Sequence, residues 1–124
     1  MKRDMDLIRY IMLRAEGVPS TDIVDWVSED FPKYDFRDVY GHVKLLMEGG
    51  FMTEVQQTLG LEDVTPGHLT WAGHDLLDAI RDDAIWRETK SVANEAGGFT
   101  IDLLKQIAVG LLKTKLKKHT GVEL

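Results

Sequence analysis

Apolar residues in the first fifty positions recur with the 3.6-residue period that is typical of α-helices. This period predicts helices over residues 4–16, about 21–30 and about 36–48. Gly17 and Val18-Pro19 separate the first two helices, and Gly49-Gly50 follows the third. Ser20 and Asp35 are the expected N-caps of the second and third. Their apolar faces contain Leu7, Ile8, Ile11, Met12 and Ala15, then Ile23, Trp26 and Val27, and then Val39, Val43, Leu46 and Met47.

The period changes to two after residue 50, through Phe51, Thr53 and Val55. Such alternation predicts a half-buried strand over 51–57. A loop that contains Pro66-Gly67 leads into the short apolar stretch 68–71. The pattern therefore predicts a β-hairpin across residues 51–71.

Helical periodicity returns after the expected hairpin. Thr70 is the predicted N-cap of a fourth helix that runs from residue 71 to the low nineties. Gly97-Gly98 marks a hinge, and a last helix follows over about 99–117. Its apolar stripe contains Ile101, Leu104, Ala108 and Leu111, and its final turns contain Lys113, Lys115, Lys117 and Lys118.

The order of these elements predicts the fold class, which is mainly α with a small β-hairpin (α+β). Three helices, a hairpin and a further helix form the order of a winged helix-turn-helix domain. We therefore expect a winged-helix domain over residues 1–96 and an appended C-terminal amphipathic helix with a basic tail over 97–124.

Three stretches resemble a bacterial and prophage protein family of unknown function. The first is the run Leu69-Thr70-Trp71-Ala72-Gly73-His74-Asp75-Leu76-Leu77-Asp78-Ala79-Ile80-Arg81-Asp82-Asp83-Ala84-Ile85-Trp86. The opening residues 1–9 and the segment 98–105 are also similar to that family. The resemblance implies a bacterial or phage-borne origin and a winged-helix-like fold, and it implies no catalytic residues.

Composition excludes several classes of protein. The 124 residues include no cysteine, so disulfides and Cys-ligated zinc are absent. No stretch is apolar enough to span a membrane, and the first residues do not resemble a signal peptide, so we expect a cytoplasmic protein. The net charge of −6 is unevenly spread: Lys and Arg outnumber Asp and Glu only in residues 99–124, by 5 to 2. This distribution argues against strong non-specific DNA binding by the rest of the chain.

Candidate catalytic chemistry is sparse. His74 and Asp78 have the i, i+4 spacing of a metal-binding pair, and His68 could supply a third ligand. Two residues fall short of a zinc motif, so capping and surface hydrogen bonding are the favoured roles of this pair. The acidic run of Asp75, Asp78, Asp82 and Asp83 is interpreted as a solvated face with Arg81 as a local partner. No phosphate-binding loop or nucleophile elbow is present. We expect no enzyme activity, catalytic residue, metal, cofactor or small-molecule substrate.

The third helix carries the candidate nucleic-acid-binding residues, because winged helices place this helix in the major groove. The predicted contacts are Arg37, Tyr40, Lys44, Gln56 and Gln57, the last two in the wing. Gly41, unusual inside a helix, suggests close approach by another backbone. Acidic neighbours and an outward Leu45 suit a protein partner equally well. Two hypotheses therefore remain: a phage- or mobile-element-associated DNA-binding regulator, and a protein–protein interaction module.

The remaining predictions concern burial and assembly. Trp26, Trp71 and Trp86 adjoin apolar stripes, so core packing is the favoured interpretation of all three. The last helix is expected to mediate a homodimer through Ile101, Leu104, Ala108 and Leu111, since an amphipathic stripe must be covered.

Overall fold

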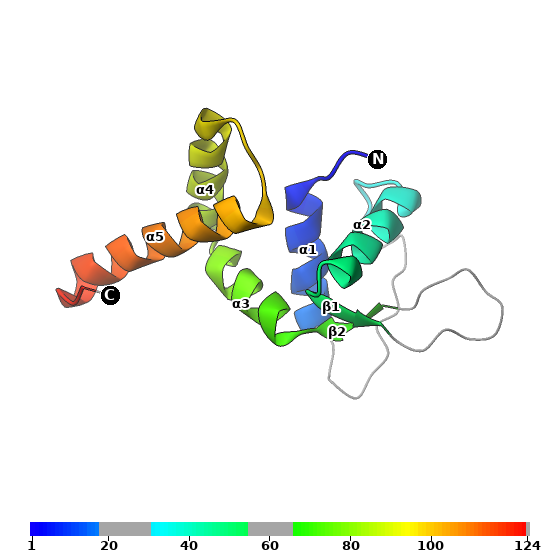
Figure 1. Ribbon diagram of the computed structural model, residues 1–124, viewed down its shortest axis with the longest axis horizontal. Coiled ribbons are helices and arrows are strands. Elements are labelled where there is room, and N and C mark those ends of the chain that lie inside the picture. The colour runs from blue at the N-terminus through cyan, green and yellow to red at the C-terminus, as the bar shows by residue number, and fades with distance from the viewer. Residues whose placement is uncertain (18–30, 55–65, 124) are drawn as a thin grey trace. The chain divides into compact units, whose positions relative to one another are not determined.

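The computed structural model describes residues 1–17, 31–54 and 66–123, and it divides into two compact units (Figure 1). The first unit is Met1–Asp75 and the second is Leu76–Leu124. The elements are mostly helices with a small two-stranded antiparallel hairpin, which confirms the α+β class. The expected second helix over 21–30, with Trp26, lies outside the described residues, as do Gln56 and Gln57.

Helix α1, Met5–Glu16, begins the first unit. It starts after Asp4 because the Asp4 carboxylate accepts hydrogen bonds from the backbone N–H groups of Asp6 and Leu7 at 3.0 and 3.2 Å. It ends at Gly17, as predicted. Its inner face is fully buried and contains Leu7, Ile8, Ile11, Met12 and Ala15.

Helix α2, Phe36–Glu48, lies between the expected cap residues. The Asp35 carboxylate accepts the Arg37 N–H at 2.8 Å, and the Gly49 N–H donates to the Leu45 carbonyl at 2.9 Å. Helix α2 packs against α1 and buries Val39, Val43 and Leu46 with His42. Both predicted helices are therefore confirmed with their ends.

The hairpin consists of β1, Met52–Glu54, and β2, Pro66–Leu69. Met52 pairs with Leu69 and Glu54 with Pro66, with an irregularity between the two pairs. The Thr53 hydroxyl accepts the His68 N–H at 3.0 Å and reinforces this irregular ladder. Strand β2 packs against α1, and both strands contact α2. The predicted hairpin is therefore confirmed for its described strands, but the alternation expected through Phe51 and Thr53 is wrong, because Met52 is buried and Thr53 is exposed.

The prediction of a single long helix after Thr70 is wrong, because the structure has two helices there. Helix α3 is Trp71–Ile80 and helix α4 is Asp83–Ala96. Between them Asp82 adopts an extended conformation (φ −68°, ψ 126°), and its carboxylate accepts the Ile85 N–H at 2.9 Å. The apolar period continues across the break and therefore conceals this internal N-cap.

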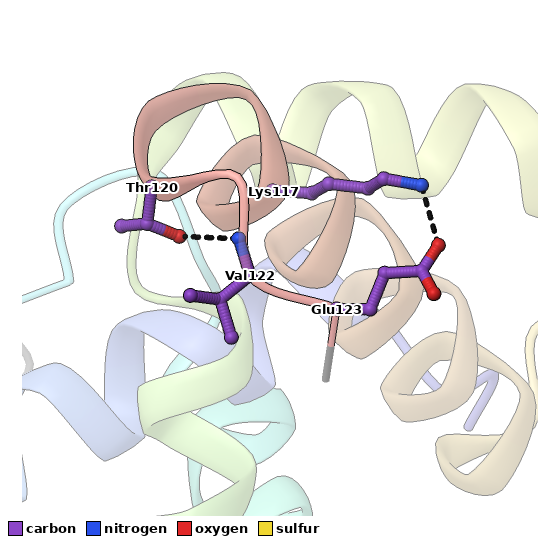
Figure 2. A network of polar contacts seen from close by, with 4 residues as sticks. All are labelled: Lys117, Thr120, Val122 and Glu123. Carbon is purple, nitrogen blue, oxygen red and sulfur yellow. Dashed lines mark hydrogen bonds and ion pairs between the residues drawn. The ribbon is translucent and has the colours of Figure 1, made fainter.

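Helix α5, Ile101–Thr120, packs against α4 within the second unit. Gly97 ends α4 in the left-handed conformation (φ 78°), which glycine adopts without strain. At the other end of α5, Glu123 folds back and accepts a hydrogen bond from Lys117 at 2.6 Å, while the Thr120 hydroxyl accepts the Val122 N–H (Figure 2). The boundary that we expected after residue 96 lies within this unit.

Two of the three tryptophans have described side chains, and they differ. Trp86 is buried at 5% exposure, as predicted, whereas Trp71 is 85% exposed, so its predicted burial is wrong. At 100° per residue, Trp71 lies about 140° around the helix from Leu76. The buried face of α3 is centred on Leu76, Leu77 and Ile80, which turns Trp71 outward.

Candidate interaction surface on helix α2

The outer face of α2 carries a connected row of aromatic and basic side chains. We call Phe36, Arg37, Tyr40 and Lys44 the α2 stripe. Phe36, Tyr40 and Lys44 follow one another at intervals of four residues, which places them along one side of the helix. The rings of Phe36 and Tyr40 stack with centroids 6.2 Å apart. The Lys44 ammonium lies 5.2 Å from the Tyr40 centroid, within cation–π range.

Arg37 is the most accessible member of the α2 stripe, with 91% of its side chain exposed. Its Nε lies 3.8 Å from Asp35, whose carboxylate already caps the helix. Exposed ion pairs of this kind contribute about 0–1 kcal/mol. The guanidinium therefore stays accessible to an anionic or planar ligand.

The inner face of α2 is held to the start of α1 by His42, which is 1% exposed. The Asp4 N–H donates to His42 Nε2 at 2.8 Å, so Nδ1 carries the proton and donates to the Asp38 carbonyl at 2.6 Å. The sequence pattern assigned no role to His42. Its position beside Val39, Val43 and Leu46 on the buried side was the available signal.

The segment before α1 also contacts α2. The Met1 sulfur lies 2.5 Å from where a Cβ of Gly41 would be, so a larger residue at this position would displace the Met1 side chain. The close approach expected at Gly41 is real, but a flexible side chain makes it and not another backbone. Lys2 and Arg3, between Met1 and the α1 cap, are exposed.

A small cavity lies where α1 meets residues 31–34. It has a volume of about 230 Å³ and is lined by Tyr10, Arg14, Phe31, Pro32, Lys33 and Tyr34. Burial raises the pKa of Tyr34 above its ordinary value, and the charges of Asp4 and Asp6 raise it further. Tyr34 therefore ionises at higher pH than a free tyrosine.

The other candidate chemistry stays dispersed. Within residues 1–17, 31–54 and 66–123, no three His, Cys, Asp or Glu side chains are grouped to hold a metal. Asp78 pairs with Arg81 at 2.6 Å, as we expected of the acidic run. In that same part of the chain, no helix is long and apolar enough to cross a membrane.

The residues predicted for self-association divide into two groups. Leu104 and Ala108 are buried within the single chain, whereas Ile101 and Leu111 are half-buried. Because α5 already packs on α4, a dimer through all four residues requires α5 to exchange between chains.

The structure thus brings Arg37, Tyr40 and Lys44 together on one exposed helix of a small α+β protein. The chain belongs to the family described as hypothetical protein (DUF2513), whose profile matches residues 2–99. It is similar to an uncharacterized protein of Haemophilus influenzae, at 32% identity over 118 residues that cover 94% of this chain and 99% of the relative. No solved structure matches the chain significantly.

Proposed function

We propose that this chain is a winged-helix DNA-binding regulator that inserts α2 into the major groove. The observation that carries the proposal is the α2 stripe, which combines two accessible cations with two stacked aromatic residues on one exposed helix face. The order of α1, α2 and the hairpin supports it, with the predicted helix over 21–30 as the first half of the helix-turn-helix and the hairpin as the wing.

The dimensions of the α2 stripe suit this role. Arg37 and Lys44 are seven residues apart, which corresponds to about 10 Å along the helix axis. The major groove is about 12 Å wide and admits one helix, so both cations reach base edges or the flanking phosphates. Tyr40 lies between them and supplies a hydroxyl. Stacking with Phe36 restricts its ring, which lowers the conformational entropy lost on binding.

Charge limits the kind of binding that we propose. The chain carries a net charge of −6, so long-range attraction to DNA is weak. Binding to duplex of random sequence should therefore be weak and confined to low salt, and preference for a particular site must come from direct contacts by the α2 stripe. We further propose that the protein is cytoplasmic and associated with a mobile element, as the resemblance noted above implies. We also propose that it has no enzyme activity or cofactor, since its polar groups are dispersed.

A binding titration against a labelled random-sequence duplex, repeated at increasing salt, tests the proposal. We expect binding at low salt with an affinity that falls as salt rises, because bound phosphates release counterions. Arg37→Gln/Lys44→Gln should weaken binding, whereas Lys113→Gln/Lys115→Gln removes the same charge from α5 and should not. Absence of parental binding at low salt would refute DNA binding.

A protein partner is the second candidate function, and exposed Phe36 is the observation that favours it. This ring is 52% exposed and stacks on Tyr40. Aromatic residues and arginine are enriched at protein interfaces. If the parent does not bind duplex DNA in the titration above, the α2 stripe is better explained as the core of a protein interface.

We also propose that the chain forms a homodimer in which α5 exchanges between copies. The width of the α5 apolar surface supports exchange, because Ile101 and Leu111 remain half-buried after α5 packs on α4. Light scattering over a range of concentrations should give the mass of two chains. A single-chain mass at every concentration would show that α5 stays packed in its own chain and would refute the dimer.

A further inference from the structure

We infer that Met1–Arg3 forms an arm on the outer face of α2, and that Lys2 and Arg3 bind phosphates of the duplex that contacts the α2 stripe. This inference rests on the proposed function and adds a second group of contacts to it. None of the binding residues predicted from the sequence precedes α1.

Two contacts attach this arm to α2. The Asp4 N–H donates to buried His42 at 2.8 Å, across a sequence separation of 38 residues. The side chain of Met1 lies in the gap that Gly41 leaves. Because these contacts hold both ends of the segment to adjacent residues of α2, Lys2 and Arg3 between them must lie beside that helix. In Figure 1 the segment before α1 extends toward the first turns of α2.

The position of Gly41 decides which side of α2 the arm occupies. Gly41 follows Arg37 by four residues and precedes Lys44 by three, so all three lie on one helix face. The arm is therefore on the same side as the α2 stripe, and a ligand that approaches the stripe meets the arm as well. Met1 itself remains 69% exposed on this side.

Charge indicates what the arm contacts. Lys2 and Arg3 add two exposed cations beside Arg37 and Lys44, in a chain that is acidic overall. Acidic side chains on this part of α2, such as exposed Asp38, otherwise offset the two stripe cations. Phosphate oxygens are ligands for both Lys and Arg, and contacts to them fix orientation without reading sequence. The arm thus provides position and affinity, while the α2 stripe reads the groove.

The experiment compares Lys2→Gln/Arg3→Gln with the parent in the salt titration on the random-sequence duplex. Loss of two phosphate contacts should lower the magnitude of the slope of log affinity against log salt by about 1.8. Lys113→Gln/Lys115→Gln is the control of equal charge and should keep the parental slope. Gly41→Ala should displace Met1, which is visible as a shift of its methyl NMR signal, and should weaken binding in the same direction.

Each outcome separates the arm from the proposed function. If the parent binds and Lys2→Gln/Arg3→Gln keeps its slope, the arm inference fails while DNA binding stands. Tighter binding by that variant would mean that the arm covers α2, which also overturns the inference. An equal loss of slope in the α5 control would assign the effect to overall charge. No binding by the parent at low salt overturns both proposals.

Discussion

A single methyl group added at two glycines should change stability in opposite directions. Gly73 lies in the first turn of α3, where its N–H donates to the Thr70 hydroxyl at 3.0 Å. The Phe51 carbonyl accepts the Thr70 N–H at 3.0 Å and also occupies the space beside Gly73. A Cβ at Gly73 would overlap this carbonyl oxygen, which belongs to the backbone and is not free to rotate away. Gly110 on α5 has no atom within 4 Å of the same position.

The magnitudes follow from these surroundings. Overpacking a tight site costs about 1–3 kcal/mol. The helix propensity of Ala relative to Gly returns at most about 1 kcal/mol. We therefore expect Gly73→Ala to lower the free energy of unfolding by about 1–2 kcal/mol. Gly110→Ala has only the propensity gain and should raise it by about 0.5–1 kcal/mol.

Thermal melts and urea titrations of the two variants measure both changes. Each kcal/mol should move the melting temperature by roughly 2–8 °C in a chain of this size. The reasoning would be refuted by a Gly73→Ala variant that is as stable as the parent, since the Phe51 carbonyl would then not restrict that site. A destabilised Gly110→Ala variant would show that the solvent side of α5 is covered.

Two pairs of variants and one titration test the site and the core. His42→Ala should lower the free energy of unfolding by about 2–3 kcal/mol, since it leaves a backbone N–H without an acceptor and removes buried volume. His74→Ala, at an exposed position, should change it by no more than about 0.5 kcal/mol. Equal melting temperatures of the two variants would show that the His42 imidazole does not stabilise the fold. Trp86→Ala should lower the free energy of unfolding by about 3–5 kcal/mol, while Trp71→Ala should leave the melting temperature near that of the parent. A large loss of stability in Trp71→Ala would contradict the exposure of this side chain. The NMR titration of Tyr34 should show ionisation at higher pH than in a free tyrosine, because its folded pKa is raised. The contribution of Tyr34 to stability is thus present at neutral pH and is lost as the pH rises through that pKa. A measured pKa at or below the ordinary tyrosine value would show that burial and the nearby carboxylates do not act on this hydroxyl.

Local signals accounted for most of the elements that sequence analysis predicted. The ends of α2 were predictable because Asp35 and Gly49 act on backbone groups within four residues of themselves. The strand after residue 50 was predicted from the alternation of Phe51, Thr53 and Val55, but the buried residue of β1 is Met52, so the strand was right and its inward face was wrong. The break at Asp82 was missed although its cap is also local, because the apolar period continues through it.

The composition of the α2 stripe was also predictable, since residues four apart on a helix must be neighbours. Arg37, Tyr40 and Lys44 were therefore expected on one helix face, where the structure places them, and their contact with DNA stays a prediction. The stacking of Phe36 on Tyr40 refined that group, and its side-chain geometry came only from the structure.

The sequence by itself determined most of the described helices and strands of this protein, the break between α3 and α4 excepted, and the residues that share a helix face, because periodicity and capping act over a few residues. Only the tertiary structure decided which distant groups meet. It brought Asp4 to His42 and Met1 to Gly41, and it turned Trp71 away from the core. Such contacts depend on how elements pack, and packing is a property of the whole unit that no local pattern contains.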